Sequence, residues 1–389
     1  MTHIMREPIA IHPHRPQADG PAIVGDEVEL QLFTTLQCNL KCSYCSESVG
    51  EVRGSAGHVG YPIAALRRFV DTHLAGLAVY ATFYGGEPTL NVAFMGEVMR
   101  EFPGFGYQLQ TNGTLLHRVP GEILARLDNI LVSVDGGRET TDGYRGRGVY
   151  NRVMRNLARV RGQVRGTLTA RVTWGHAGTT LEEIEGLLES FDYVYFQFAH
   201  RDDVYGPADL EAKRRVLARM VERFFERGGD YPIVPVMGIV RNKALPHLAG
   251  AGPDGLTQCR VSTHIINVLP DGSIYPCPDM VWDPQMRQGS VTENRLSRSA
   301  LQPHRDMPCE GCEAFAWCRR NCMKNLHVAY VKRDEHYRRR VVEPICELVR
   351  FMGREVDRHR PASWLREAPA AVREEVAGSR IYRYVEVMP

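Results

Sequence analysis

The sequence alternates between short apolar runs and segments with helical periodicity, and this alternation constrains the fold more than any other feature. Six runs of strand length are predicted, and they are Glu29–Thr35, Leu77–Tyr84, Tyr107–Gln110, Ile130–Val134, Gly166–Trp174 and Tyr193–Ala199. Strands that alternate with helices form βαβ units and a parallel sheet. We therefore expect an α/β protein with a partial (β/α)6 barrel of TIM type, and its site should lie where the strands end.

The other segments divide the chain into further parts. Residues 1–27 are rich in His, Pro and Gly and are predicted to be an irregular lead-in. The barrel is expected over 28–230, followed by a linker over 231–254. Residues 255–350 are predicted to form a second, cysteine-rich α+β unit, and 351–389 a C-terminal helix and tail.

Bulk composition narrows the class of partner. Of the 389 residues, 43% are hydrophobic and 24% are charged, and the formal net charge is +2, so no basic excess indicates a nucleic acid. No apolar run is long enough to span a bilayer, and the first residues lack the apolar core of a signal peptide. We expect a cytoplasmic protein with no membrane partner.

The ten cysteines are unevenly distributed. Three lie at 38–45, none between 46 and 258, and seven between 259 and 346. Without an export signal, this pattern favours metal ligation over disulfides. Cys38, Cys42 and Cys45 could hold three irons of a four-iron cluster and leave the fourth open to a small molecule. A zinc site or buried free cysteines would also fit these three residues alone.

The spacing Cx3CxΦC, with Tyr44 as the aromatic residue, resembles the signature of the radical S-adenosylmethionine family. The resemblance implies a [4Fe-4S] cluster at Cys38, Cys42 and Cys45 that binds S-adenosylmethionine. One electron from that cluster would cleave the cofactor to a 5′-deoxyadenosyl radical, which removes a hydrogen from the substrate. Gly85, Gly86 and Glu87 follow the second strand and match the family motif that meets the cofactor's amino group.

Later strand ends also resemble the family's cofactor site. Polar side chains there are expected to contact the ribose and the carboxylate of S-adenosylmethionine, with Ser133 and Asp135 as the best candidates. Two arginines could bind the carboxylate through a guanidinium fork, although surface ion pairs would explain them equally well. The candidates at these positions are Thr111, Asn112, Ser133, Asp135, Arg145 and Arg171.

The seven later cysteines resemble the SPASM extension, which binds two auxiliary [4Fe-4S] clusters. The resemblance assigns Cys259, Cys277 and Cys322 to the first auxiliary cluster. The second would be held by Cys309, Cys312, Cys318 and Cys346. A turn at 270–272 predicts a β-hairpin that carries Cys277 beside Cys259.

The first auxiliary set lacks a fourth cysteine. Sulfatase-maturing relatives have one just after the position of Cys259, where this chain has 260–264 instead. Ser262 or His264 could complete the site, or one iron could stay open for the substrate. A hydrogen-bonded structural role is the simpler interpretation of His264.

A general base is expected where the sixth strand ends, with His200 and Asp202 as candidates. Ordinary polar loop residues would look the same. Sulfatase-maturing relatives carry an aspartate base before the first auxiliary cysteine, but the stretch 235–238 has no acid, which weakens that specific assignment.

The resulting hypothesis is an enzyme that makes an oxidative crosslink in a ribosomally made peptide. Two alternatives stay open: a dehydrogenase or epimerase of a small molecule such as an aminocyclitol, and a non-enzymatic iron–sulfur electron-transfer protein. The expected partners are a peptide substrate, a separate leader-peptide-binding protein, and an electron donor such as flavodoxin or ferredoxin.

Overall fold

The computed structural model describes residues 22–23, 25–45, 57–175, 178–250, 257–281 and 283–385. Most of the expected lead-in, 1–21 and 24, therefore lies outside the described residues. Six parallel strands form the core of the barrel: β1 (Glu27–Thr35), β2 (Ala78–Gly85), β3 (Gly106–Thr111), β4 (Asn129–Ser133), β5 (Thr167–Trp174) and β6 (Tyr193–Phe198). Each of the six predicted strands is confirmed.

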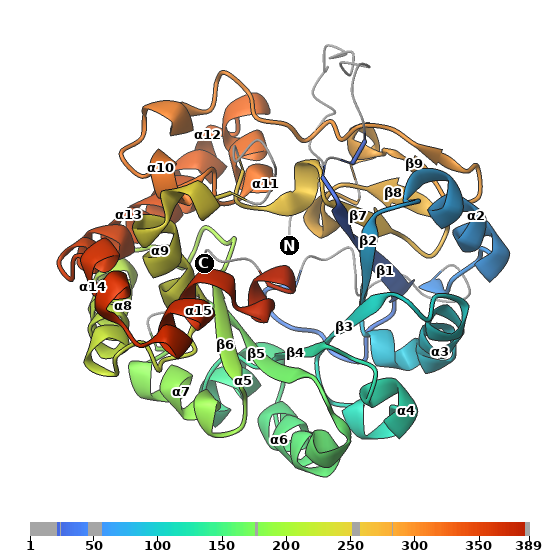
Figure 1. Cartoon of the computed structure of the whole chain (residues 1–389), viewed down its shortest axis with the longest axis horizontal. Helices are drawn as coiled ribbons and strands as arrows, with labels where there is room; N and C mark the ends of the chain where they lie inside the picture. Colours follow the sequence, from blue (N-terminus) through green and yellow to red (C-terminus); the bar gives the residue numbers. More distant parts are fainter. Residues whose placement is uncertain are drawn as a thin grey trace, which may run out of the picture.

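Helices surround this sheet on the outside, as Figure 1 shows in the view down the barrel. They are α2 (Ile63–His73), α3 (Val92–Glu101), α4 (Gly121–Leu124), α5 (Arg138–Arg145), α6 (Val149–Val160), α7 (Leu181–Gly186) and α8 (Pro207–Glu226). In α2 the buried residues Leu66, Phe69 and Val70 recur at helical spacing, so one face packs on the sheet. Thr180 starts α7 with a capping box closed by Glu183.

Side chains on β1 alternate between two environments because successive residues of a strand point to opposite faces. Val28, Leu30 and Leu32 are fully buried in the main hydrophobic core. Glu29 faces the other way, and Thr82 on β2 donates to its Oε1 at 2.7 Å. Hydrogen bonds continue this polar layer from strand to strand inside the barrel, through Gln108, Asn129 and Thr169.

The cysteine-rich segment extends the same sheet. Strand β7 (Ile265–Val268) pairs with β1 in parallel, and β8 (Ser273–Tyr275), β9 (Gly289–Ser290) and β10 (Arg295–Leu296) follow in antiparallel order. The predicted hairpin is therefore present, with its turn at Gly272, where φ is +84°. The sheet has ten strands in the order β10-β9-β8-β7-β1-β2-β3-β4-β5-β6.

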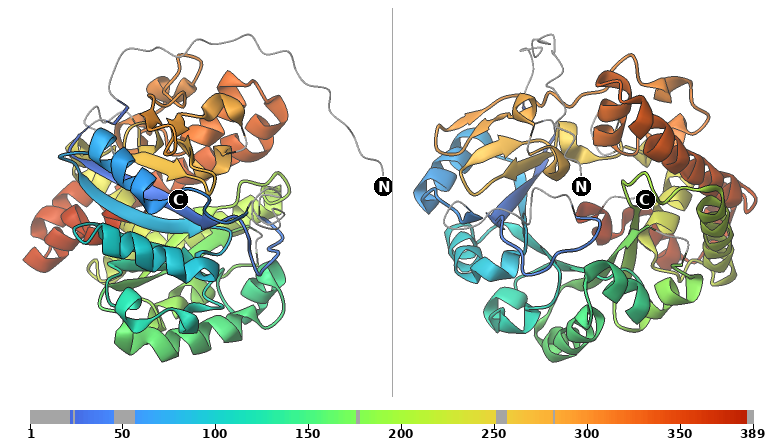
Figure 2. Two further views of the ribbon diagram at one scale, coloured as in Figure 1. Left: turned by 90° about the vertical axis from the view of Figure 1, so that its right-hand side faces the viewer. Right: turned by 180° about the vertical axis from the view of Figure 1, so that it is seen from behind.

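Short helices complete the cysteine-rich segment. They are α10 (Phe315–Cys318), α11 (Met323–Leu326) and α12 (Glu335–Tyr337), with π-helical turns at His327–Val331 and Arg338–Val342. Figures 1 and 2 place this segment, coloured yellow to orange, on the opposite side of the barrel from α6.

The structure differs from the prediction of a linker at 231–254. This stretch contains α9 (Val234–Ala244), in which every residue from Val234 to Val240 is buried. Pro235 occupies the first turn, where its missing N–H costs no hydrogen bond. The apolar run therefore forms a core helix rather than a connection.

The C-terminal part is also more structured than the predicted helix and tail. It consists of α13 (Glu343–Asp357), α14 (Pro361–Glu367), α15 (Ala370–Gly378) and a short turn at Arg380–Arg383. Ile381 and Val385 are buried against Leu131 of β4 and Tyr195 of β6. In Figure 1 the described chain ends near the centre of the barrel, so its last residues fill the interior between the strands.

Candidate active site

The first three cysteines lie on the loop that follows β1. Burial raises the pKa of the Cys42 thiol to about 11, Arg145 opposes this, and Cys45 and Cys38 raise it further. The three thiols are therefore close enough to influence one another. The backbone N–H of Leu40 donates to Cys38 Sγ at 3.5 Å, and Asn112 Nδ2 donates to the same sulfur at 3.8 Å. Thiolates are the ligands that iron–sulfur clusters require, so this donor set fits a cluster.

The paired glycines at the end of β2 allow the cysteine loop to pass. A Cβ on Gly85 would lie 2.2 Å from the carbonyl oxygen of Thr35, and a Cβ on Gly86 would lie 2.2 Å from that of Gln37. Gly86 N donates to Thr35 O at 2.9 Å, and Glu87 N donates to Gln37 O at 2.8 Å. The backbone of the cysteine loop therefore passes close to both glycines, whereas the family motif implied that a ligand approaches them.

Glu87 is fully buried and joins two strand ends. Its Oε1 accepts from the hydroxyls of Thr89 at 2.5 Å and Thr111 at 2.6 Å, and its Oε2 accepts from Asn112 N at 2.7 Å. Burial raises the pKa of this carboxyl, and the hydrogen bonds act in the opposite direction. Glu87 therefore positions the ends of β2 and β3, and its contact with the cofactor stays a prediction.

A buried ion pair links the cysteine loop to β4. Asp135 accepts from Arg145 Nε at 2.7 Å and Arg145 Nη2 at 2.9 Å, and the two side chains are 0% and 5% exposed. The Tyr44 hydroxyl donates to both Asp135 oxygens, and Thr173 N donates to Oδ1 at 3.0 Å. These four residues form the Asp135 network, in which each is hydrogen-bonded to the Asp135 carboxylate or accepts through it. A cofactor that contacts Tyr44, Asp135 or Arg145 would therefore compete with these hydrogen bonds.

Arg171 differs from Arg145 because no ion pair engages it in the described part of the chain. Its Nη2 donates to Gln197 Oε1 at 2.8 Å, and its side chain is half-buried. Strand pairing places it opposite Ser133 of β4. Its positive charge also lowers the pKa of Tyr84, against a larger rise caused by burial.

His200 and Asp279 meet inside the molecule. His200 Nδ1 lies 3.7 Å from Asp279 Oδ2. Burial lowers the pKa of His200 despite the carboxylate, so the imidazole is neutral at pH 7. Burial would raise the pKa of Asp279, but His200 and the charge of Lys324 outweigh it and hold that pKa at about 2. The Asp279 side chain is 50% exposed, and the His200 side chain is 17% exposed.

Asp202, the other predicted base, does not join this group. Its side chain is 56% exposed and accepts from His336 Nε2 at 2.8 Å. That hydrogen bond lowers its pKa. The turn after β6 thus directs His200 inward and Asp202 to the surface.

Asp279 and Lys324 were not predicted as site residues from the sequence. Each lies two residues after a cluster cysteine, Cys277 and Cys322, and this proximity was the available signal. Lys324 Nζ donates to the Tyr337 hydroxyl at 2.9 Å. Its charge also acts on Asp279 and His200, so a carboxylate, an imidazole and a cation lie close to one another.

The cysteines of the first auxiliary set lie close to one another and to Asp279. Burial raises the pKa of Cys277 well above its usual value, and the charges of Asp279, Cys322 and Cys259 raise it further. His264 is 4% exposed and its Nδ1 lies 2.6 Å from the Thr263 hydroxyl, which agrees with a structural histidine. The side chain of Ser262 lies outside the described residues, so the fourth ligand stays an expectation.

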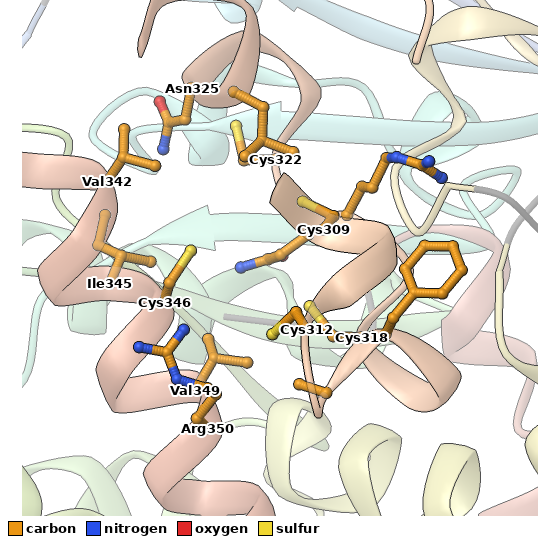
Figure 3. A pocket seen from close by; sticks show the side chains of 15 residues that line it. Cys309, Cys312, Cys318, Cys322, Asn325, Val342, Ile345, Cys346, Val349 and Arg350 are labelled. Atoms are coloured by element: carbon orange, nitrogen blue, oxygen red, sulfur yellow. The ribbon is translucent and has the colours of Figure 1, made fainter. Parts of the chain in front are cut away.

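The second auxiliary set lines one cavity, shown in Figure 3. Cys322, which the resemblance assigns to the first auxiliary set, lines the same cavity. The four cysteines of the second set come from α10, the turn before it and α13, and they are Cys309, Cys312, Cys318 and Cys346. Burial raises the pKa of Cys346 to about 12, and the charge of Cys309 adds to this. The lining is otherwise largely apolar, so the cavity fits an all-thiolate cluster. Within the described ranges, no three Cys, His, Asp or Glu side chains are gathered tightly enough to hold a single metal ion.

The fold and the cysteine loop can now be compared with known families. Residues 32–191 match the model of the Radical SAM superfamily. The expected partial barrel with a C-terminal, cysteine-rich α+β domain is confirmed.

Several known proteins are similar to this chain. A cysteine-type anaerobic sulfatase-maturating enzyme of Clostridium perfringens is 22% identical over 327 residues, which cover 74% of this chain and 86% of that enzyme. An uncharacterized protein of Archaeoglobus fulgidus is 31% identical over 125 residues, but the match spans only 32% of this chain and 29% of that protein.

Solved structures extend the likeness in fold. The structure of anSMEcpe with bound AdoMet has a TM-score of 0.65 at 19% identity and covers 90% of this chain and 98% of that one. Streptococcus suis SuiB bound to its precursor peptide SuiA has a TM-score of 0.57 at 15% identity, with 78% and 74% covered. Among the described residues, no helix is long and apolar enough to cross a membrane.

Proposed function

We propose that this protein cleaves S-adenosylmethionine and oxidatively modifies a peptide, forming a crosslink in a ribosomally made precursor. One observation carries the proposal: His200 Nδ1 lies 3.7 Å from Asp279 Oδ2, and the charge of Asp279 raises the pKa of both Cys45 and Cys277. This imidazole–carboxylate pair is therefore close to both the loop that starts radical chemistry and the first auxiliary set. An oxidation that removes a hydrogen atom, an electron and a proton needs these groups together.

The cofactor would be held at the ends of the strands. When bound, the cluster at the first three cysteines supplies one electron to S-adenosylmethionine, which yields the radical that takes a hydrogen from the substrate. Arg171 is the better candidate for the carboxylate of the cofactor, because Asp135 already engages the guanidinium of Arg145 in two hydrogen bonds. Ser133, opposite Arg171 on β4, would donate to the same carboxylate.

The proton would leave through the pair of His200 and Asp279. The neutral imidazole accepts a proton from the substrate, and the neighbouring carboxylate stabilises the imidazolium that forms. Lys324, which donates to the Tyr337 hydroxyl, acts on both groups through its charge. Asp202 is not assigned a role in the reaction, because its carboxylate binds His336 at the surface.

A peptide substrate is supported by the similar proteins. The solved relatives include anSMEcpe with a bound Kp18Cys peptide and SuiB with its precursor peptide. In this proposal the two auxiliary cysteine sets hold [4Fe-4S] clusters that take up the second electron. A flavodoxin or ferredoxin would supply the first one, and a separate protein would present the leader peptide.

The reaction is tested in two steps with the anaerobically reconstituted protein. Reduction in the presence of S-adenosylmethionine should release 5′-deoxyadenosine, and Cys42→Ala should abolish it. The precursor peptide encoded beside the gene should then lose two hydrogen atoms by mass spectrometry. If only a small alcohol or amine is turned over, the small-molecule alternative replaces the peptide. If no 5′-deoxyadenosine forms above a control without protein, both enzymatic hypotheses fail and electron transfer is left.

Two carboxylate variants test the assignment of the base. Asp279→Asn should still cleave S-adenosylmethionine but form at least tenfold less product, because the imidazolium that forms on His200 loses its stabilising carboxylate and general-base catalysis contributes roughly 10²–10⁴ in rate. Asp202→Asn, the matched exposed control, should retain wild-type product formation. Equal losses in both variants would contradict the assignment.

A further inference from the structure

The cavity of the second auxiliary set is lined by a cation that forms no ion pair with the described residues. Arg350 on α13 lines this cavity together with the four cysteines of that set and Cys322. Figure 3 shows its guanidinium beside Cys346, on the same face of the helix. Arg350 forms no ion pair within the described residues, because the acids near it on α13 are used elsewhere: Glu343 pairs with Arg338, and Glu347 with Arg214.

The second arginine in this cavity is different. Arg320 Nη2 lies 2.5 Å from Glu310 Oε1, and its guanidinium stacks over the Phe315 ring at 4.9 Å. Its charge is therefore compensated by a carboxylate. Both arginines act on the thiolates: the charge of Arg320 opposes the rise in the pKa of Cys309, and that of Arg350 opposes the rise in the pKa of Cys346. Arg350 differs in that no carboxylate of the described residues pairs with it.

An uncompensated cation changes the redox properties of a cluster in such a cavity. Four thiolates give an oxidised [4Fe-4S]2+ cluster a net charge of −2, and its reduction makes that charge −3. A positive charge in an apolar lining stabilises the more negative state, because the low dielectric constant strengthens the attraction. Glu343 also acts on Cys346, but less than Arg350, and it pairs with Arg338. Beside Cys277 and Cys322 of the first auxiliary set, Asp279 and Lys324 carry charges of opposite sign.

We propose that Arg350 raises the reduction potential of a cluster held by Cys309, Cys312, Cys318 and Cys346, so that the electron removed from the substrate comes to rest there. This direction of transfer rests on the proposed function. The substrate radical would give one electron, which converts [4Fe-4S]2+ to [4Fe-4S]1+, and one proton to His200 and Asp279. An external one-electron acceptor of the flavodoxin or ferredoxin class would then reoxidise the cluster. Arg350 is a positioning residue in this scheme, since it need not touch the substrate.

The test measures potentials without substrate, so that it is independent of the proposed reaction. A full-length variant with Cys38, Cys42 and Cys45 changed to Ala leaves only the auxiliary signals for electron paramagnetic resonance. In this background Arg350→Gln should shift the equilibrium of one auxiliary centre toward the oxidised state by at least tenfold, which is 59 mV for a one-electron couple. Arg350→Lys, which keeps the charge, should titrate close to the parent.

Arg354 provides the matched control, because it lies one turn further along α13, is 53% exposed and pairs with Glu313. Arg354→Gln should leave both potentials unchanged. An Arg350→Gln variant that titrates like the parent would overturn the proposal. If Arg350→Gln lowers the iron content by one cluster while Arg350→Lys preserves it, the redox role is also overturned, and Arg350 is assigned to cluster assembly instead.

Discussion

Replacing Asp135 by Asn should destabilise the protein strongly, because it leaves Arg145 charged and buried without a partner. Both side chains are at most 5% exposed, and the carboxylate accepts hydrogen bonds from Arg145, Tyr44 and Thr173. Removing one partner of such a buried pair costs ~3–5 kcal/mol. That is a large part of the ~5–15 kcal/mol that stabilises a typical protein.

The assay is urea unfolding of the anaerobic, reduced protein, followed by tryptophan fluorescence. With a denaturant slope of ~3 kcal/mol per molar urea, the midpoint should fall by ~1 M or more. Asp192→Asn is the control, since the pair of Asp192 and Arg161 is 31% and 50% exposed and should contribute at most ~1 kcal/mol.

A double variant separates lost charge pairing from lost packing. Asp135→Asn combined with Arg145→Met removes both charges, so its destabilisation should be well below the sum of the two single losses. Additive losses, or an Asp135→Asn variant as stable as the parent, would refute the claim that Asp135 and Arg145 stabilise each other.

The remaining predictions concern the loop glycines and a buried histidine. Gly86→Ala should prevent the first cluster from assembling, because the new Cβ would meet the backbone of Leu36 and Gln37. Iron analysis should then show one cluster fewer. Gly104→Ala is the control and should keep its full iron content, because no atom lies within 4 Å of its Cβ. Burial lowers the pKa of His327 to about 4, so its stabilising contribution is complete above the unfolded pKa of ~6.5 and is lost as pH falls from there toward 4. His327→Gln should therefore show a shallower loss of stability between pH 7 and 5 than the parent in urea unfolding, whereas exposed His247→Gln should follow the parent curve; identical slopes in all three proteins would contradict this.

The barrel could be predicted from the sequence because its signal is local. Each strand is an apolar run followed by a helical period, and β1, β2 and β6 lie within two residues of their predicted bounds. The helix α9 was missed because its buried run, Val234 to Val240, has no polar face to reveal helical periodicity.

The cofactor site was predictable only in part. Motif spacing located the residues, but it did not show that Asp135 and Arg145 would bind each other, since that pairing depends on how α5 packs on the end of β4. The role of Asp279 beside His200 depends on contacts between distant segments, because Asp279 comes from the cysteine-rich domain and His200 from the barrel. No local pattern records such a meeting.

The last residues of the chain complete a domain that the first residues begin. Ile381 and Val385 pack on Leu131 and Tyr195, and Arg383 Nη2 lies 3.3 Å from Glu27 Oε2 on β1. The barrel is therefore closed by contacts between segments that are far apart in the sequence, at Glu27 and at 381–385. Contacts of such high sequence separation slow folding, because the chain between them must be ordered before they can form.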